Sequence, residues 1–336
     1  MHRKNNNLSK KILTWYDNNK RILPWRLETG LKKKQDYRLL SEFMLQQTQV
    51  KTVIPYFKKF VKKIPNLEVL SQSSSGKILK LWEGLGYYRR AKNLHKTAKI
   101  IIKKYNGTLP KELNEIQKLP GVGKYTANAL LALVYNQANV PFDGNVKRIF
   151  LRLFKIRLEK NEKKISKIIK ENFSTKRNDD LAEALMEFGA LVCKPINPLC
   201  AKCNLKKNCY FFKNKDLILI DIKKADKKKK YNIYCYLNKG RKEIALKKNN
   251  KLSFLKNFKI PRTELVTIEG KKKAGWIYLC SYKNNISNVR MDINLFYKFV
   301  KLKPKNYNWY SVEKENREFI PTFTKKIFKK IGKVYY

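Results

Sequence analysis

Four cysteines in one short segment constrain this chain more than any other feature. They are Cys193, Cys200, Cys203 and Cys209, and their spacing is C-x6-C-x2-C-x5-C. Thiolates crowded into one segment can converge on a single metal centre, and four of them complete a [4Fe-4S] cluster. A zinc ribbon would more often show two C-x2-C pairs, whereas only one is present, and four unrelated buried thiols are rarely spaced so closely. The spacing therefore predicts an iron–sulfur cluster.

Length and charge indicate the size of the fold and the kind of partner. The chain has 336 residues, enough for about two domains with their own hydrophobic cores. Lysine and arginine total 77 against 26 acidic residues, which gives a formal net charge of +51. A field of that sign favours a polyanion, and nucleic acid is the expected partner. The basic residues are scattered over the whole chain, so their positions do not locate the binding surface.

The sequence carries no visible signal for secretion or membrane insertion. Residues 1–7 lack the apolar core of a signal peptide, and no apolar run approaches the ~20 residues that span a bilayer. No basic amphipathic helix with a Trp/Phe face favours a membrane surface. Cys235 and Cys280 show no partner pattern, so a disulfide framework is not expected. We therefore expect a cytoplasmic protein, associated with the nucleoid if it is bacterial.

Hydrophobic periodicity is helical over the first two thirds of the chain. Over Asp36–Phe57, apolar residues such as Phe43 and Val50 recur at three-to-four-residue steps or multiples of them, which predicts one helix with one buried stripe. The stretch 221–230 is charged and has little to bury, so it predicts a linker between domains.

After this stretch the pattern changes to one typical of strands. Three short runs are rich in β-branched and aromatic residues: Ile233–Leu237, Glu243–Leu246 and Trp276–Cys280. The sequence therefore predicts an all-α domain over 1–220, the linker 221–230 and a smaller domain with a sheet over 231–336.

Two carboxylates are candidates for acid–base chemistry. His2 and His95 are the only histidines, so carboxylates are the more plausible acids and bases. Glu42 lies on the predicted helix 36–57, where most glutamates are merely solvated. Asp143 opens the sequence Asp-Gly-Asn, which is equally typical of a turn and helix cap. The residues alone leave both alternatives open.

The segment Leu119–Thr126 reads as a helix-hairpin-helix. Gly121 and Gly123 permit a tight turn that exposes backbone N–H groups to a phosphate at the start of the next helix. Any pair of helices can use a Gly-x-Gly connection, so a plain structural turn is the alternative.

Read together, these segments resemble one family. Residues 41–48 (Ser-Glu-Phe-Met-Leu-Gln-Gln-Thr), 119–123 (Leu-Pro-Gly-Val-Gly) and 143–148 (Asp-Gly-Asn-Val-Lys-Arg), with the cysteine segment, resemble the MutY-type adenine DNA glycosylases of the helix-hairpin-helix superfamily. The resemblance runs from about Leu23 to Cys209. It implies a mainly α protein: a two-lobed, all-α helix-hairpin-helix glycosylase domain with an iron–sulfur cluster loop, followed by a smaller α+β Nudix-like domain.

The resemblance also implies catalytic roles. Glu42 would be the general acid that protonates adenine, and Asp143 would stabilise the sugar cation or form a covalent intermediate. We predict a raised pKa for Glu42. Tyr125 stands where endonuclease III-type relatives carry a Schiff-base lysine, so base removal with little or no strand cleavage is expected. Asn145 and Glu187 complete the candidate catalytic set, Glu187 as a residue that supports the catalytic group.

The same resemblance implies a set of contacts to DNA. Gln47 and Tyr87 would be wedges in the base stack, because an enzyme that acts on a paired base must rotate it out. Ser287, in Ile286-Ser287-Asn288, is the candidate for a loop that reads the opposite base, although the aromatic and histidine of the family's loop are absent. The full candidate set is Gln46, Gln47, Thr48, Leu85, Tyr87, Gly121, Gly123, Lys124 and Ser287.

The sequence thus predicts a monomeric adenine DNA glycosylase with a [4Fe-4S] cluster held by the four cysteines. Its substrate would be double-stranded DNA with adenine opposite 8-oxoguanine or guanine. Two alternatives remain open at this point. One is an endonuclease III-like glycosylase/lyase for oxidised pyrimidines, and the other is a non-catalytic iron–sulfur DNA-binding protein.

Overall fold

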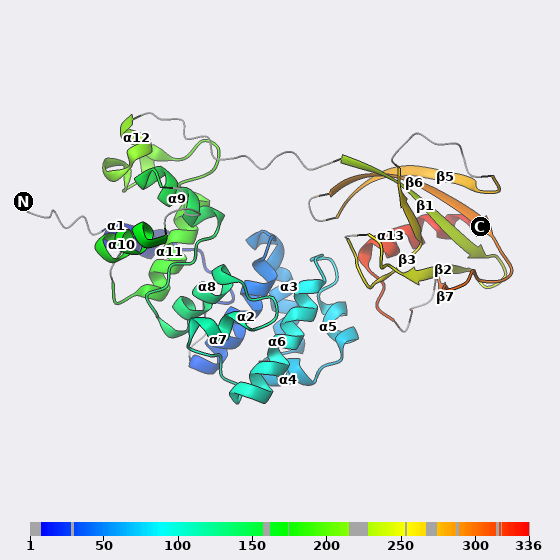
Figure 1. The fold of residues 1–336 in the computed structure, drawn as a ribbon, viewed down its shortest axis with the longest axis horizontal. Coiled ribbons are helices and arrows are strands. Elements are labelled where there is room, and N and C mark those ends of the chain that lie inside the picture. Colours follow the sequence, from blue (N-terminus) through cyan, green and yellow to red (C-terminus); the bar gives the residue numbers. More distant parts are fainter. Residues whose placement is uncertain are drawn as a thin grey trace, which may run out of the picture. The chain divides into compact units, whose positions relative to one another are not determined.

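A computed structural model describes most of the chain, in two units. The described residues are 8–27, 30–156, 162–173, 175–214, 228–252, 254–266, 274–286, 289–313, 316 and 318–335. The first unit comprises residues 1–73 and 93–222, and the second comprises 74–92 and 223–336. Figure 1 shows the helices of the first unit and the sheet of the second.

The first unit is helical. Its helices are α1 (Leu8–Asn19), α2 (Leu31–Leu45), α3 (Val50–Lys63), α4 (Leu67–Gln72), α7 (Leu113–Gln117), α8 (Lys124–Tyr135), α9 (Gly144–Phe154), α10 (Glu162–Asn172), α11 (Asn178–Leu191) and α12 (Tyr210–Asn214). Helix α6 (Arg89–Tyr105) begins in the second unit and continues in the first. Short 3-10 turns η2 (Cys200–Lys202) and η3 (Lys206–Asn208) lie in the cysteine segment.

Helix α11 is central to the packing of the first unit. It contacts α1, α8 and α9, while α2 packs on α8. The buried residues of its core include Phe188 of α11, Phe150 of α9 and Ile12 of α1. Burying side chains of this size is the main favourable term in folding. The thiols of Cys193, Cys203 and Cys209 pack against this same cluster, so the cysteine segment rests on the helical core.

The prediction of one helix over 36–57 is wrong. Helix α2 ends at Leu45 and α3 begins at Val50, because Gln46 adopts φ −52° and ψ 109° and Gln47 adopts the left-handed φ of 58°. The buried face of α3 consists of Val53, Phe57 and Phe60. The intervening Gln-Gln-Thr-Gln contains no glycine or proline to mark the break, so the apolar period seemed to continue through it.

The second unit contains a mixed sheet. Its strands are β1 (Lys228–Asn238), β2 (Glu243–Lys248), β3 (Lys259–Ile260), β4 (Arg262–Leu265), β5 (Ile277–Ile286), β6 (Val289–Phe299) and β7 (Asn308–Ser311). Their order is β3-β2-β1-β6-β5, with β4 on β1 and β7 on β2, and β1 and β6 are parallel. The predicted runs Ile233–Leu237 and Glu243–Leu246 fall within β1 and β2, and the run Trp276–Cys280 is confirmed from Ile277 onward, where β5 begins.

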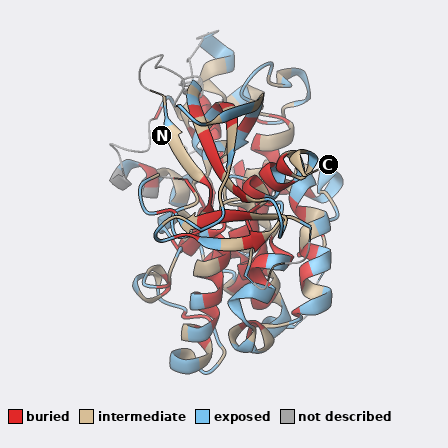
Figure 2. Cartoon of the chain, turned by 90° about the vertical axis from the view of Figure 1, so that its right-hand side faces the viewer, coloured by how far each residue is buried: buried red, intermediate tan, exposed pale blue. Residues whose placement is uncertain are grey.

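One helix covers the core of this sheet. Helix α13 (Thr322–Ile331) buries Phe323, Ile327, Phe328 and Ile331 against strand residues such as Leu295. Figure 2 colours the chain by burial, with buried residues in red. Helix α5 (Ser75–Leu81) and turn η4 (Gly332–Val334) belong to the same unit. The fold class is thus a helical domain with a C-terminal sheet domain.

Most of the predicted linker 221–230 lies outside the described residues, and β1 begins at Lys228. Within the described parts of the chain, no helix has the length and apolar character that crossing a membrane requires.

Candidate active site

Several helices of the first unit border one cleft of about 880 Å³. The candidate catalytic side chains that line it are Glu42 from α2, Tyr125 from α8, Asp143 and Asn145 from the start of α9, and Glu187 from α11. Residues far apart in the sequence therefore meet at one cavity. Gln46, Gln47 and Thr48, from the turn between α2 and α3, line the same cleft.

Glu42 is a buried carboxyl at the wall of this cleft. Its side chain is only 5% exposed, and burial raises its pKa to about 7, because a carboxylate loses water there. The hydroxyl of Tyr125, which donates to Oε2 at 3.2 Å, and the charge of Arg38 partly oppose this rise in pKa. The charge of Asp143 adds to it. A group with this pKa exists in both acid and base forms near neutral pH.

Asp143 is both a helix cap and a residue of the cleft. Its Oδ1 accepts the N–H groups of Asn145 (2.8 Å) and Val146 (2.7 Å) at the start of α9, and its Oδ2 accepts Asn145 Nδ2 at 2.8 Å. The cap that the sequence suggested therefore exists beside the cleft-lining role. Burial raises the pKa of Asp143, while these hydrogen bonds and the charge of Arg148 hold the pKa back.

Arg148 connects the end of α9 nearest the cleft with the cysteine segment. Its Nη2 donates to Asn145 Oδ1 and to the Gly189 carbonyl, both at 2.7 Å, and its Nε donates to the Cys193 carbonyl at 2.6 Å. Because Asn145 in turn donates to Asp143, one chain of hydrogen bonds runs from Cys193 to Asp143. In the sequence, Arg148 stands out only as part of the motif at 143–148. Asn145 and Arg148 are three residues apart and so share one face of a helix. This spacing was the sequence signal for their contact.

Glu187 is held by arginines that sequence analysis missed. Its Oε1 accepts Arg21 Nε at 3.0 Å and Arg26 Nη1 at 2.7 Å, and the side chain is 1% exposed. Glu183, one turn earlier, pairs with Arg26 and Arg38 and accepts the Tyr16 hydroxyl. Burying a carboxylate is costly unless it is paired and hydrogen-bonded, and these arginines provide the pairing. The spacing Glu-x-x-x-Glu on α11 was the only sequence signal for this network.

Of the two glycines in the hairpin between α7 and α8, only Gly121 has a backbone conformation that requires glycine. Gly121 has φ +83°, and a Cβ there would lie 2.8 Å from Asn93 Nδ2 and 2.9 Å from Phe43 Cε1, so only glycine fits. Gly123 is the N-cap of α8 with an ordinary φ of −90° and provides no side-chain cap. The first N–H groups of α8 therefore receive no side-chain hydrogen bond from the cap position, and Lys124 beside them is exposed.

The two predicted wedge residues share an uncommon backbone conformation. Gln47 has φ 58° and Tyr87 has φ 47°, although neither is glycine. Non-glycine residues in this region are strained, and such residues cluster at functional sites. The side chain of Gln47 is exposed at the cleft. Leu85 and Tyr87 belong to the second unit, and Ser287 lies outside the described residues.

The four cysteines line one small cavity of about 30 Å³, together with apolar side chains, Arg152 and Lys206. Arg152 Nη1 lies 3.5 Å from Cys193 Sγ, and its guanidinium also donates to the carbonyls of Lys194 and Pro195. Among the described residues, no three His, Cys, Asp or Glu side chains converge as ligands of a single metal ion. Four thiols and two cations around a common space suit an anionic iron–sulfur cluster, whose ligands surround several metal atoms.

Gly189 of α11 lies close against Asn145 in the Asp143 turn, and its replacement is a direct test of that turn. A Cβ at this position would lie 2.5 Å from Asn145 Cβ and 3.0 Å from Asn145 backbone atoms. We expect Gly189→Ala to displace Asn145, to reduce single-turnover adenine release more than tenfold and to destabilise the fold by about 1–3 kcal/mol. Thermal unfolding and excision assays check this. Gly76→Ala, where nothing lies within 4 Å of the added Cβ, is the matched control; equal behaviour of the two variants would contradict the expectation.

Residues 40–175 match the family model described as HhH-GPD superfamily base excision DNA repair protein. A solved structure titled as a thermostable thymine-DNA glycosylase covers 62% of this chain and 95% of its own, with 28% identity and a TM-score of 0.55. An endonuclease III–DNA covalent intermediate, at 22% identity and a TM-score of 0.51, shares the fold. These findings define the class, a helix-hairpin-helix DNA glycosylase.

Curated relatives identify the family within this class. An adenine DNA glycosylase of Buchnera aphidicola (subspecies Baizongia pistaciae) is 37% identical over 96% of both chains. The adenine DNA glycosylase of Homo sapiens is also 37% identical, over 59% of this chain and 38% of that one. The chain belongs to the adenine DNA glycosylase family. Its activity is hydrolysis of the N-glycosidic bond of adenine in base excision repair, and neither the endonuclease III-like nor the non-catalytic alternative is favoured.

Proposed function

We propose that Glu42 and Asp143 divide the work of adenine excision in the cleft of the first unit. The observation that carries the proposal is the pair of environments: Glu42 is buried with a pKa raised to about 7, whereas Asp143 accepts three hydrogen bonds. Two carboxyls whose surroundings differ in this way are a recurrent means of obtaining an acid and an anion in one site.

The chemistry requires one carboxyl of each kind. As the bond between adenine and C1′ breaks, its electron pair moves to the base and positive charge develops on the sugar. Glu42 in its acid form donates a proton to the departing adenine, and Asp143 as the carboxylate opposes the charge at C1′. Water then adds at C1′ and leaves an abasic site, and the proton that the water releases restores Glu42. Glu187 and Asn145 are positioning residues for this pair.

Tyr125 cannot cleave the DNA strand in this scheme, because its side chain has no amine. Its hydroxyl lies 3.2 Å from Glu42 Oε2 in the cleft, where a lysine would be needed to form a Schiff base. Burial, together with the charges of Glu42 and Asp143, raises the pKa of Tyr125 well above its ordinary value, so it remains a neutral donor. The activity we propose is therefore monofunctional, or nearly so.

The four cysteines would hold a [4Fe-4S] cluster. Their clustering around one cavity, with Arg152 and Lys206 beside it, supports this assignment. When bound, the cluster would brace the segment 193–209 and hold its positive surroundings in place for DNA; glycosidic hydrolysis transfers no electrons. Iron and sulfide analysis of the purified chain tests the assignment.

The second unit would be a Nudix-like domain that reads the base opposite the target adenine. A mixed sheet with parallel β1 and β6 and one covering helix is compatible with that assignment. We propose 8-oxoguanine·A as the preferred substrate and G·A as a second one, with the chain acting as a monomer on double-stranded DNA. Gln47 and Tyr87, both in left-handed backbone conformations, would enter the base stack.

The uncapped start of α8 would bind a DNA phosphate, with Lys124 beside it. We expect Lys124→Gln to weaken binding about equally for 8-oxoguanine·A, G·A and matched duplexes, because phosphate contacts carry no base information. The negative slope of log affinity against log salt should become shallower by about 0.9. Lys103→Gln, an exposed lysine in the last turn of α6, is the control. A loss confined to one duplex would instead indicate base recognition.

The proposed function is tested by single-turnover adenine release from 8-oxoguanine·A, G·A and 8-oxoguanine·C duplexes, with and without alkali. Cleavage of the adenine strand only after alkali is the expected result for a monofunctional enzyme. A higher rate with 8-oxoguanine than with guanine is expected if the second unit reads the opposite base. Strand cleavage without alkali would contradict the role given to Tyr125.

A further inference from the structure

The second unit joins two pieces of the chain that are distant in sequence. Residues 74–92, which include the proposed wedge Tyr87, cluster with residues 223–336. Tyr88, next to the wedge, makes both hydrogen bonds and ring contacts between these two pieces. Tyr88 is only 5% exposed.

The hydroxyl of Tyr88 lies at the start of α13. It is 2.9 Å from Thr322 Oγ1 and accepts the Thr322 backbone N–H at 3.3 Å. The first N–H groups of a helix have no partner within the helix, and a polar N-cap side chain normally satisfies one. Here the N-cap is Pro321, which makes no side-chain cap. Tyr88 therefore supplies from another part of the chain the cap that α13 lacks.

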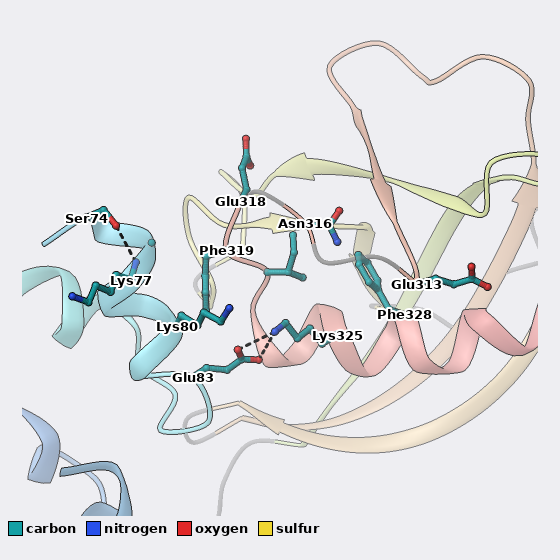
Figure 3. A pocket seen from close by; sticks show the side chains of 12 residues that line it. Ser74, Lys77, Lys80, Glu83, Glu313, Asn316, Glu318, Phe319, Lys325 and Phe328 are labelled. Carbon is teal, nitrogen blue, oxygen red and sulfur yellow. Dashed lines mark hydrogen bonds and ion pairs between the residues drawn. The ribbon is translucent and has the colours of Figure 1, made fainter. Parts of the chain in front are cut away.

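The ring of Tyr88 is enclosed by aromatic side chains of the same unit. Its centroid lies 5.4 Å from that of Phe258 and 5.0 Å from that of Phe319, and those two rings are 6.0 Å apart. Edge-to-face and tilted pairs at these distances are favourable beyond the apolar area they bury. Beside this cluster Glu83 pairs with Lys325 of α13 at 2.8 Å, as Figure 3 shows. This ion pair is partly exposed and contributes little.

The segment around Tyr87 is also held by contacts between its own residues. Trp82 Nε1 donates to the Gly86 carbonyl at 3.2 Å, and the Arg90 guanidinium lies 5.3 Å from the centre of the Tyr87 ring. Tyr87 thus sits, with φ 47°, between a turn fixed by Trp82 and an anchor fixed by Tyr88. A strained residue persists only where its neighbours determine its conformation.

The same segment shares a cavity with the end of β5. Gly84–Tyr88 and Asn284–Ile286 line one cavity of about 260 Å³, and β5 ends at Ile286, immediately before Ser287. Lys326 of α13 donates to Asn284 Oδ1 at 3.0 Å. Helix α13 therefore contacts both the anchor of the wedge and the strand that leads to the proposed reading loop.

We propose that Tyr88 is a specificity-determining positioning residue, which fixes the wedge segment to the sheet unit and so couples recognition of the opposite base to insertion of Tyr87. This rests on the proposed function of Tyr87 and of the second unit. Tyr88 is not among the residues that line the cleft with Glu42 and Asp143. Its loss should therefore reduce discrimination between 8-oxoguanine and guanine while the basal excision of adenine opposite guanine persists.

The experiment compares Tyr88→Phe with the unchanged chain in single-turnover adenine release from 8-oxoguanine·A and G·A duplexes. Phenylalanine keeps the ring contacts and removes both hydrogen bonds. We expect the 8-oxoguanine·A rate to fall about three- to tenfold and the G·A rate to stay within about twofold, since a single hydrogen-bonding group is at stake. Thr322→Val should change the rates in the same direction, and the double variant should be no worse than Tyr88→Phe alone. Tyr105→Phe, which removes a 2.8 Å hydrogen bond to Glu115 in the first unit, should leave both rates unchanged.

The outcomes separate this inference from the proposed function. If the unchanged chain itself shows no preference for 8-oxoguanine, the proposed reading by the second unit fails. If the chain has the preference and Tyr88→Phe retains it in full, only the coupling role of Tyr88 fails. An equal loss on both duplexes with a lowered melting temperature would show a purely structural role, and additive effects of the two substitutions would overturn the claimed contact with Thr322.

Discussion

Glu42→Gln should slow single-turnover adenine release by about 10²–10⁴-fold, the range that a positioned general acid contributes. Glutamine has nearly the same shape and can still accept the hydroxyl of Tyr125, but it has no proton to give to the departing base. The variant should therefore bind an adenine-containing duplex about as tightly as the unchanged chain. Glu68→Gln, at an exposed glutamate paired with Lys32 at 2.9 Å, is the matched control and should keep full activity.

The pH dependence provides a second readout of the same residue. With a pKa raised to about 7, Glu42 is protonated below that pH, so the excision rate should be flat there and decline about tenfold per pH unit well above it. Glu42→Gln should lose this decline. A wild-type profile that already declines near pH 4.5 would place the acid elsewhere.

Stability should respond to Glu42 with a definite sign. Its pKa is higher in the folded chain than its ordinary value of 4.5, so its contribution to stability is fully present below that value and is lost as pH rises toward about 7. At pH 8 the folded chain buries a carboxylate, whereas the Glu42→Gln chain buries a neutral amide. Glutamine should therefore raise the melting temperature at pH 8, and the loss of activity cannot then be attributed to unfolding.

The parts of this molecule that the sequence predicted are those encoded by local pattern. Strand runs such as Ile233–Leu237 are rich in β-branched and aromatic residues, and the cysteine spacing lies within 17 consecutive positions. Motif residues such as Glu42 and Asp143 were found through the resemblance, and the structure brings them to one cleft.

The parts that were missed depend on contacts between distant segments. The break between α2 and α3 is made by Gln46 and Gln47, whose backbone is held by tertiary structure, since Gln46 Nε2 donates to the Gly121 carbonyl at 3.2 Å. Nothing local to Tyr88 predicts that it caps a helix beginning at Thr322, 234 residues later. Long-range polar contacts of this kind follow from packing and have no periodicity to read.

Replacing the carboxylate of Asp143 should produce the other large effect. In Asp143→Asn and in Asp143→Ser the charge that opposes the sugar cation is lost, and we expect adenine release to fall at least 10²–10³-fold, as it does when one preorganised electrostatic partner of a transition state is removed. The difficulty is that Asp143 also caps α9, with N–H···O distances of 2.8 and 2.7 Å to Asn145 and Val146. A lost cap could slow the reaction by unfolding the turn.

These two substitutions separate charge from capping, because asparagine and serine cap helices about as well as aspartate does. Both variants should unfold within a few degrees of the unchanged chain, while Asp143→Ala should lose about 1 kcal/mol more. Asparagine places an amide beside Asn145 Nδ2, which now donates to Asp143 Oδ2 at 2.8 Å, and serine removes that acceptor altogether. If both retain the fold and lose excision together, the carboxylate charge is what they have in common. If either excises adenine at more than a tenth of the original rate, Asp143 serves mainly as a cap, and another group must stabilise the sugar cation.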